Sequence, residues 1–205
     1  MIELLDSCPN CFSRDAFPAH FTGSAFVVSS DRERALLHHH RKLNRWLQLG
    51  GHCDGEEDVP LVAQREASEE SGIDGLVMAS SRPFDLDIHR IPAFASEPPH
   101  MHYDVRYVLI APEGAKISIS FESNELRWFT ADEMKTCNLD RGLRRLVEKW
   151  EKEFRSQKTD CGLRIADCRL GNPELRTPNS EPRERRTANG ERRTVNGERR
   201  TVNAN

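Results

Sequence analysis

The segment DVPLVAQREASEESG, residues 58–72, predicts one helix with a defined beginning and end. Asp58 has the side chain of an N-cap, and Pro60 suits the first turn, where its missing N–H costs nothing. Gly72 suits the left-handed backbone position that follows the last helical residue. What this helix can pack against depends on where its acidic residues lie.

Three glutamates of this helix lie on the flank that also carries its apolar side chains. At about 100° per residue, Glu70 falls within the apolar arc, Glu66 lies at its side and Glu69 lies further round. The arc consists of Val59, Val62, Ala63 and Ala67. Arg65 can pair with Glu69, but one arginine cannot neutralise three acids whose burial is costly. A divalent cation can, and carboxylate oxygens suit Mg²⁺ or Mn²⁺, so the helix predicts a metal site.

The sequence around this helix predicts a domain of mixed α/β content. Strands are expected at residues 25–28, 35–37, 76–78, 84–91, 105–110 and 125–129. The first two flank a polar turn and predict a hairpin. Asn138 is expected to cap a second helix, whose apolar side chains recur at helical spacing as far as Phe154.

The spacing of the acidic residues resembles the Nudix box. Gly51 is followed after five residues by Glu57, and after seven more by REASEESGI, residues 65–73, so that all nine defined positions match. Trp46–His52 and residues 125–129 are also similar to the family, although Leu49 stands where a proline is common. The resemblance covers about residues 20–155 and implies an α/β fold with a mixed sheet sandwiched between helices.

The resemblance implies an activity and a set of site residues. Nudix hydrolases cleave a nucleoside diphosphate linked to another moiety by attack of water at phosphorus, with Mg²⁺ or Mn²⁺ as cofactor. The implied metal ligands are Glu57, Glu66, Glu69, Glu70 and a carbonyl of Gly50 or Gly51. Arg65 is implied to orient the glutamates. The general base stays open among Glu66, Glu69, Glu122 and Glu125.

Several histidines and arginines are candidates for contacting substrate. His100 and His102 project to the same side of an extended segment, and His52 lies in the box loop. With His89 they predict either a substrate pocket or a further metal position, and the alternative is an exposed polar loop. The candidate substrate-binding residues are His52, His100, His102, Arg41 and Arg45. The pattern GGH…EPPHMHYDVRY resembles a bacterial Nudix subgroup, without indicating which nucleotide is the substrate.

Two other functions are alternatives to hydrolysis. Isopentenyl diphosphate isomerase has the same fold and binds a metal with histidines and glutamates, but its box is degenerate. A Nudix-like sensor that binds a nucleotide without cleaving it is expected to lose box glutamates, and this chain keeps them. Release of phosphate-containing products separates a hydrolase from both.

The last part of the sequence has a different composition. ERRTANG, ERRTVNG and ERRTVNA repeat with a period of seven, but one small apolar residue per repeat cannot make a coiled coil. Residues 157–205 carry 11 Lys and Arg against 7 Asp and Glu, so a tail that contacts RNA is an alternative to a low-complexity extension. We expect a lead-in at 1–19, a Nudix domain at 20–156, and a disordered tail at 157–205.

Other sequence features bear on location and partners. No apolar run approaches the roughly 18 residues of a membrane span, and the first residues do not form a secretion signal. The six cysteines are therefore expected to be reduced thiols in a cytoplasm. Cys8 and Cys11 have zinc-ligand spacing, but a zinc ribbon needs a second such pair. The expected partner is a small nucleotide rather than a membrane or nucleic acid, and a homodimer is compatible with the sequence.

Overall fold

The computed structural model describes residues 1–94, 97–121 and 123–155, so the predicted tail lies outside the described residues. The helical elements are α1 (Ile2–Ser7), α2 (Val59–Ser71), α3 (Ala131–Thr136), α4 (Arg141–Trp150) and the π-helical turn η1 (Glu151–Arg155). The strands are β1 (Ala19–Val28), β2 (Arg34–His40), β3 (Arg45–Leu47), β4 (Leu49–His52), β5 (Val77–Met78), β6 (Asp85–Ile91), β7 (His100–Ile110) and β8 (Ser123–Thr130). None of the described helices combines the length and apolar character that a membrane span requires.

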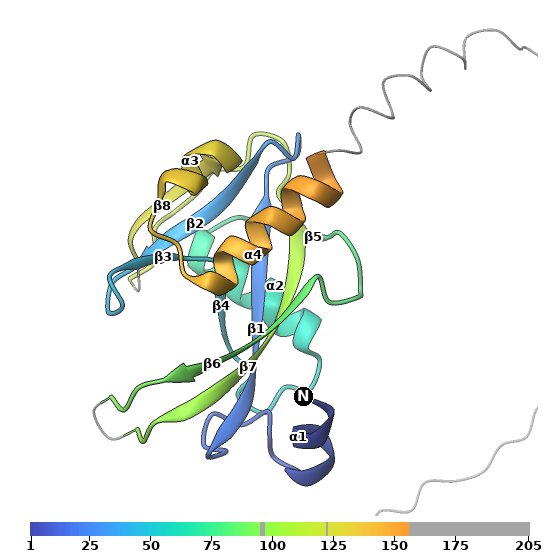
Figure 1. Ribbon diagram of the computed structural model, residues 1–205. Helices are drawn as coiled ribbons and strands as arrows, with labels where there is room; N and C mark the ends of the chain where they lie inside the picture. Colours follow the sequence, from blue (N-terminus) through green and yellow to red (C-terminus); the bar gives the residue numbers. More distant parts are fainter. Residues whose placement is uncertain (95–96, 122, 156–205) are drawn as a thin grey trace, which may run out of the picture. The chain divides into compact units, whose positions relative to one another are not determined.

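The strands form one mixed sheet around β1 and β7 (Figure 1). These two strands run parallel over their whole paired length, from Ala19 opposite Met101 to Val28 opposite Ile110. On its other side, β1 pairs antiparallel with β4 through its middle and with β2 at its end. The hairpin predicted around the polar turn is therefore present, and β7 begins five residues before the predicted strand.

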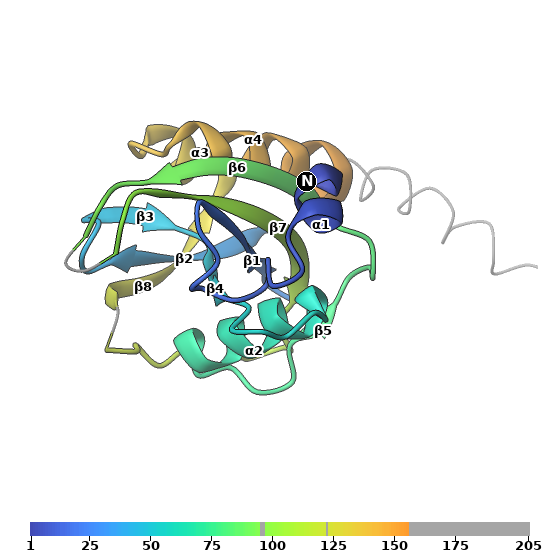
Figure 2. The same cartoon turned by 90° about the horizontal axis from the view of Figure 1, so that it is seen from below.

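Helices cover both faces of the sheet, as the resemblance implied (Figure 2). Helix α2 packs on one face, where its Val62 and Ala63 are fully buried in a core with Phe21 of β1 and Leu109 of β7. Helices α3 and α4 pack on the other face, around the buried Trp150. The predicted fold class, α/β with a mixed sheet between helices, is confirmed.

Helix α2 has the predicted ends and lies unusually close to the sheet. The Asp58 side chain accepts a hydrogen bond from the backbone N–H of Leu61 at 3.3 Å, and Gly72 has a φ of 66°. A Cβ at Gly23 of β1 would lie 3.0 Å from the Val59 carbonyl oxygen. Glycine at that position lets the helix backbone approach β1 and places the glutamates near the edge of the sheet.

The region of helices α3 and α4 differs from the prediction in two places. The N-cap of α4 is Asp140, whose side chain accepts from the Leu143 N–H at 2.8 Å, so the prediction of Asn138 as the cap was wrong. Either side chain can cap a helix, and local pattern does not decide between them. Helix α3 was missed, although Thr130 and Glu133 form a capping box at its start.

Candidate functional site

One face of the sheet changes from apolar to polar along β1 and β7. At the end covered by α4, Phe26 and Val108 belong to the buried core. At the other end the same face carries polar side chains at alternate positions, which are His20, Thr22 and Ser24 on β1 and His102, Asp104 and Arg106 on β7. This polar half adjoins a cavity of about 910 Å³. The site lies where the helices leave the sheet uncovered.

Two of the box glutamates line this cavity. The Glu66 side chain is partly exposed, whereas Glu70 is 6% exposed, which is rare for an acid. Glu70 Oε2 accepts a hydrogen bond from the Gly50 N–H at 2.8 Å. Glu70 Oε1 lies 3.8 Å from Nδ1 of His38, but burial lowers the pKa of that ring to about 4, so the ring is neutral at pH 7. The contact between His38 and Glu70 is therefore not an ion pair at that pH.

Gly50 and Gly51 of β4 make room for these acids. A Cβ at Gly51 would overlap the Glu66 carboxylate, and a Cβ at Gly50 would lie 2.6 Å from Cα of Ser24. Another residue at Gly50 would push β4 away from the β1 backbone, and another residue at Gly51 would displace the Glu66 carboxylate. Two carboxylates beside bare backbone give a cradle of oxygen donors, which fits a hard divalent cation such as Mg²⁺.

Arg65 connects Glu66 with Glu69, and of the box acids Glu69 and Glu57 lie outside the cavity lining. Its Nη1 lies 2.8 Å from Glu66 Oε1 and 3.6 Å from Glu69 Oε2, an arrangement that can orient both side chains. The Glu69 side chain is 61% exposed, and Glu57 is exposed in the loop before α2. Neither lines the cavity. Their metal-binding roles stay predictions.

A buried arginine holds a group of aspartates on the cavity wall. Arg106 is 3% exposed, and its Nε donates to Asp104 Oδ2 at 2.7 Å while Nη2 donates to Asp87 Oδ2 at 3.2 Å. The other oxygen of Asp104 accepts from the hydroxyls of Thr22 at 3.0 Å and Ser24 at 2.6 Å. The signal for this group in the sequence is the run of charged residues at alternate strand positions. That signal was not among the predicted features.

Helix α4 contributes the remaining cations of this network. Arg145 Nη2 lies 2.6 Å from Asp85 Oδ2 and 2.9 Å from Asp87 Oδ1, and Lys149 Nζ lies 2.6 Å from Asp85 Oδ1. Burial alone would raise the pKa of both carboxyls, but hydrogen bonds from Arg145, with Lys149 also bonded to Asp85, hold each pKa below its usual value. The aspartates are therefore charged and paired at pH 7, so they are structural anions rather than vacant ligands.

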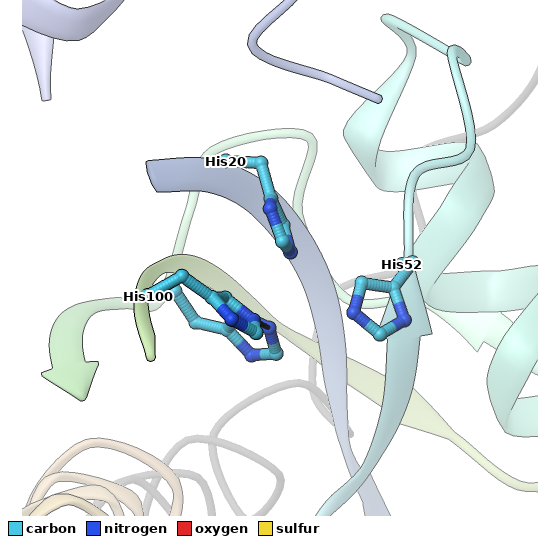
Figure 3. A group of neighbouring side chains, drawn as sticks. His20, His52 and His100 are labelled. Atoms are coloured by element: carbon cyan, nitrogen blue, oxygen red, sulfur yellow. Dashed lines mark hydrogen bonds between the residues drawn. The ribbon is translucent and has the colours of Figure 1, made fainter. Parts of the chain in front are cut away.

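Four histidines gather at the polar end of the sheet, and Figure 3 labels three of them, His20, His52 and His100. His20, His52, His100 and His102 each offer a ring nitrogen, and these atoms all lie within 4.8 Å of one another. His100 and His102 are on the same side of β7, as predicted, with their Nε2 atoms 3.1 Å apart. Burial, followed by the neighbouring rings, lowers the pKa of His102 to about 2. Burial, followed by Arg14, lowers that of His52 to about 4. No local pattern had indicated His20.

The remaining predicted residues are spread more widely. Arg45 lines the cavity together with His52 and His102. Arg41 instead bonds to the Asn124 side chain and the Ser123 carbonyl at the β2–β8 edge. Glu125 is exposed on β8 opposite His39 and does not line the cavity, and Glu122 lies outside the described residues. The proposed roles of Arg41 and Glu125 stay predictions.

Comparison with known proteins bears on the family. The model of the NUDIX domain matches residues 20–150, which is more than half of the chain. The chain belongs to the NUDIX family. The prediction of a Nudix-type pyrophosphohydrolase, an enzyme acting on acid anhydrides, is thereby confirmed.

Solved NUDIX structures share the fold of this chain. A NUDIX-family hydrolase from Clostridium perfringens has a TM-score of 0.51 and 24% identity, covering 64% of this chain and 96% of that one. An Ap4A hydrolase from C. elegans, solved as a binary complex, has a TM-score of 0.50 and 17% identity, covering 66% and 98%. A comparison with curated protein sequences returns no match. At these identities the likeness concerns the fold alone.

Proposed function

We propose that this NUDIX protein hydrolyses a pyrophosphate bond in a nucleoside diphosphate linked to another moiety, with Mg²⁺ or Mn²⁺ as cofactor. The observation that supports this most directly is the position of Glu66 and Glu70. Both carboxylates face one cavity beside the Gly50–Gly51 backbone, although they belong to a helix that otherwise packs against the core. A helix that only supported the sheet would have apolar side chains at those positions.

In this proposal, Glu66 and Glu70 hold the cation together with a backbone carbonyl at Gly50 or Gly51, and Glu69 reaches it from the rim. A divalent ion bound there supplies positive charge for the phosphoryl oxygens and lowers the pKa of water. Arg65 fixes the direction of the Glu66 carboxylate. Of the acids considered as general base, Glu66 lines the cavity, and we assign to it the acceptance of the proton from water.

The cavity has the size and charge that a nucleotide requires. Its volume of about 910 Å³ falls within the roughly 300–1,000 Å³ typical of small-molecule sites. Exposed cations stand along it, among them Lys42, Arg45, Arg90 and Arg141. They differ from Arg106 and Arg145, whose charges are matched by aspartates. We assign to the exposed cations the attraction of the phosphates and of the anionic moiety attached to them.

The proposal is tested by incubating the full chain with a set of nucleotides in the presence of Mg²⁺ or Mn²⁺. The set includes sugar-linked nucleoside diphosphates, dinucleotides such as Ap4A, and nucleoside triphosphates. Release of nucleoside monophosphate or phosphate is the expected result. Binding of a nucleotide without release of product by either ion would instead identify a sensor. Conversion of isopentenyl diphosphate with both phosphates retained would identify an isomerase.

Variants of the box helix then test the assignment of the site. Glu70→Gln is expected to lower turnover about 100-fold or more, beyond the roughly 10–100-fold typical of residues that only support ligands. Glu69→Gln should lower it less because that side chain is mainly exposed. The matched control is Glu148→Gln on the outer side of α4, which should leave turnover unchanged. Equal activity of Glu70→Gln and the control would refute the carboxylate site.

The same variants have an expected effect on stability. With chelator present, Glu70→Gln should melt no lower than the unaltered chain, because it keeps the side-chain volume and removes a buried charge. With Mg²⁺ present, the unaltered chain should gain stability through ligand binding to the folded state, and the variant should gain less. Thermal melting in both conditions measures the difference.

A further inference from the structure

We propose that His20, His52, His100 and His102 form a second metal site, which binds one transition-metal ion of the Zn²⁺ type. Within the part of the chain that the structure describes, the cluster offers imidazole nitrogens and no carboxylate. Imidazole suits Zn²⁺, Co²⁺, Ni²⁺ and Cu²⁺, whereas Mg²⁺ and Mn²⁺ prefer the carboxylate oxygens of Glu66 and Glu70. The inference does not depend on the hydrolase activity.

The spacing of the nitrogens is close to that of a four-coordinate site. Zn–N bonds of about 2.0–2.1 Å place the nitrogens of a tetrahedral site about 3.3 Å apart. The Nε2 atoms of His100 and His102 already lie 3.1 Å apart, and no pair in the cluster exceeds 4.8 Å. Ion binding would have to draw the wider pairs together by up to about 1.5 Å. Figure 3 shows the His20 and His52 rings directed toward His100.

Backbone carbonyls select the tautomer of two rings. Nδ1 of His20 lies 3.2 Å from the Ala16 carbonyl oxygen, and Nδ1 of His100 lies 2.9 Å from the Pro98 carbonyl oxygen. A carbonyl only accepts, so Nδ1 carries the hydrogen in each ring and Nε2 keeps its lone pair. Hydrogen bonds of this kind are what hold histidine ligands in metal sites. Both lone pairs point into the cluster.

The lone pair of His20 Nε2 accepts no hydrogen bond from the described residues. His20 is 1% exposed, and its Nε2 has no hydrogen-bond partner within the described part of the chain. His102 can donate its Nε2 hydrogen to His100, but that leaves His20 as a buried acceptor without a donor. A bound cation would satisfy the lone pairs of all four rings at once.

The surroundings can accept the added charge and let the ion in. Of the charges near His52, Arg14 opposes positive charge, whereas Asp54, which pairs with Arg14, and Glu97 favour it. Asp104 adds a carboxylate two residues after His102 on β7 and pairs with Arg106. His52 and His102 line the cavity, so an ion can reach the cluster from solvent through it. These features complete the requirements of ligands, geometry, support and an entry path.

The test is a metal titration of the full chain after removal of any affinity tag and dialysis against chelator. With Mg²⁺ in excess to occupy the carboxylates, one equivalent of Co²⁺ or Zn²⁺ is expected to bind, and Co²⁺ should give visible bands of low coordination number. His20→Gln and His102→Gln should each weaken binding about 100-fold or more. The matched control His39→Gln, on β2 outside the cluster, should bind like the unaltered chain.

A second control addresses the cysteines, and a second method avoids variants altogether. The double change Cys8→Ser and Cys11→Ser should leave the stoichiometry at one. X-ray absorption at the zinc edge of the unaltered chain should show nitrogen scatterers at about 2.0–2.1 Å, whereas cysteine ligation gives sulfur at about 2.3 Å. Sulfur ligation, failure to bind one equivalent, or unchanged binding by folded His102→Gln would overturn the site.

Discussion

The two groups of candidate metal ligands adjoin one cavity, and the chain builds them in opposite ways. Glu66 and Glu70 stand four residues apart on α2, so one helical turn brings them together. The histidines come from β1, β4 and β7, and three strands must pair in the right register before their rings meet. The first group offers charged carboxylate oxygens as ligands, and the second offers neutral imidazole nitrogens.

This difference shows what each group demands of the fold. The carboxylates need only the helix and two glycines, and their charge demands a cation of hard character. The histidines need the parallel pairing of β1 with β7, which places His20 directly opposite His102, and the pairing of β4, which places His52 opposite Thr22. A change inside either group should therefore affect its own ion, and a change in the network between them should affect both.

The largest effect is expected from Arg106→Met. Arg106 pairs with Asp104, which lies two residues after His102 on β7. Asp104 also accepts a hydrogen bond from Ser24, which lies opposite Gly50. Removing one partner of a buried ion pair leaves uncompensated charge, so unfolding free energy should fall by about 3–5 kcal/mol. Binding of both ions should weaken. Urea denaturation and metal titration measure the two effects.

The control for this change is Lys135→Met, which breaks exposed pairs with Asp132 and Glu151, residues that do not line the cavity. An exposed pair contributes about 0–1 kcal/mol, so the control should be nearly neutral. If Arg106→Met costs no more than Lys135→Met, the aspartates do not depend on Arg106 and the two metal groups are independent of the network.

A smaller effect is expected from pH in the chelated protein. The pKa values of about 4 for His52 and about 2 for His102 lie below the unfolded value of 6.5, so the unfolded chain binds more protons between these values. Stability should therefore fall as pH drops from 7 to 5, by about 1–2 kcal/mol per ring. The aspartates, whose pKa values are lowered from 3.8, contribute a loss only below about pH 4.

Urea denaturation at pH 7, 6 and 5 measures this dependence, and His102→Gln provides the comparison. The variant should lose less stability than the unaltered chain over the same range because one buried ring is gone. If the stability of the unaltered chain does not change between pH 7 and 5, the rings are hydrated in solution. That result would contradict the burial of these histidines.

No effect is expected from removing residues 157–205, which we propose to be dispensable. Both cores and both groups of ligands are formed by residues before that point. The shortened chain should melt at the same temperature, turn over substrate at the same rate, and bind the same equivalents of each metal. Loss of activity in a folded, soluble product would show that the tail takes part in function.

Sequence alone determined the features that depend on neighbours along the chain. Local periodicity and turn chemistry predicted the caps of α2 at Asp58 and Gly72 and the helical spacing of the glutamates. They also predicted the hairpin of β1 and β2. The Nudix box, and with it the fold class, was visible because its defined positions lie within one short stretch, from the end of β4 to just past α2. Local pattern failed where two neighbouring residues could do the same work, as with Asn138 and Asp140 before α4.

Only the tertiary structure decided which of these residues share a site. It buried Glu70 and left Glu69 exposed, although both lie on the same helix, because the sheet covers only one side of α2. It also brought His20 to His102 across more than eighty residues. Pairing register between distant strands is set by the packing of whole faces, and no short stretch of sequence specifies it. The histidine cluster is therefore a property of the sheet, while the glutamate cluster is a property of the helix.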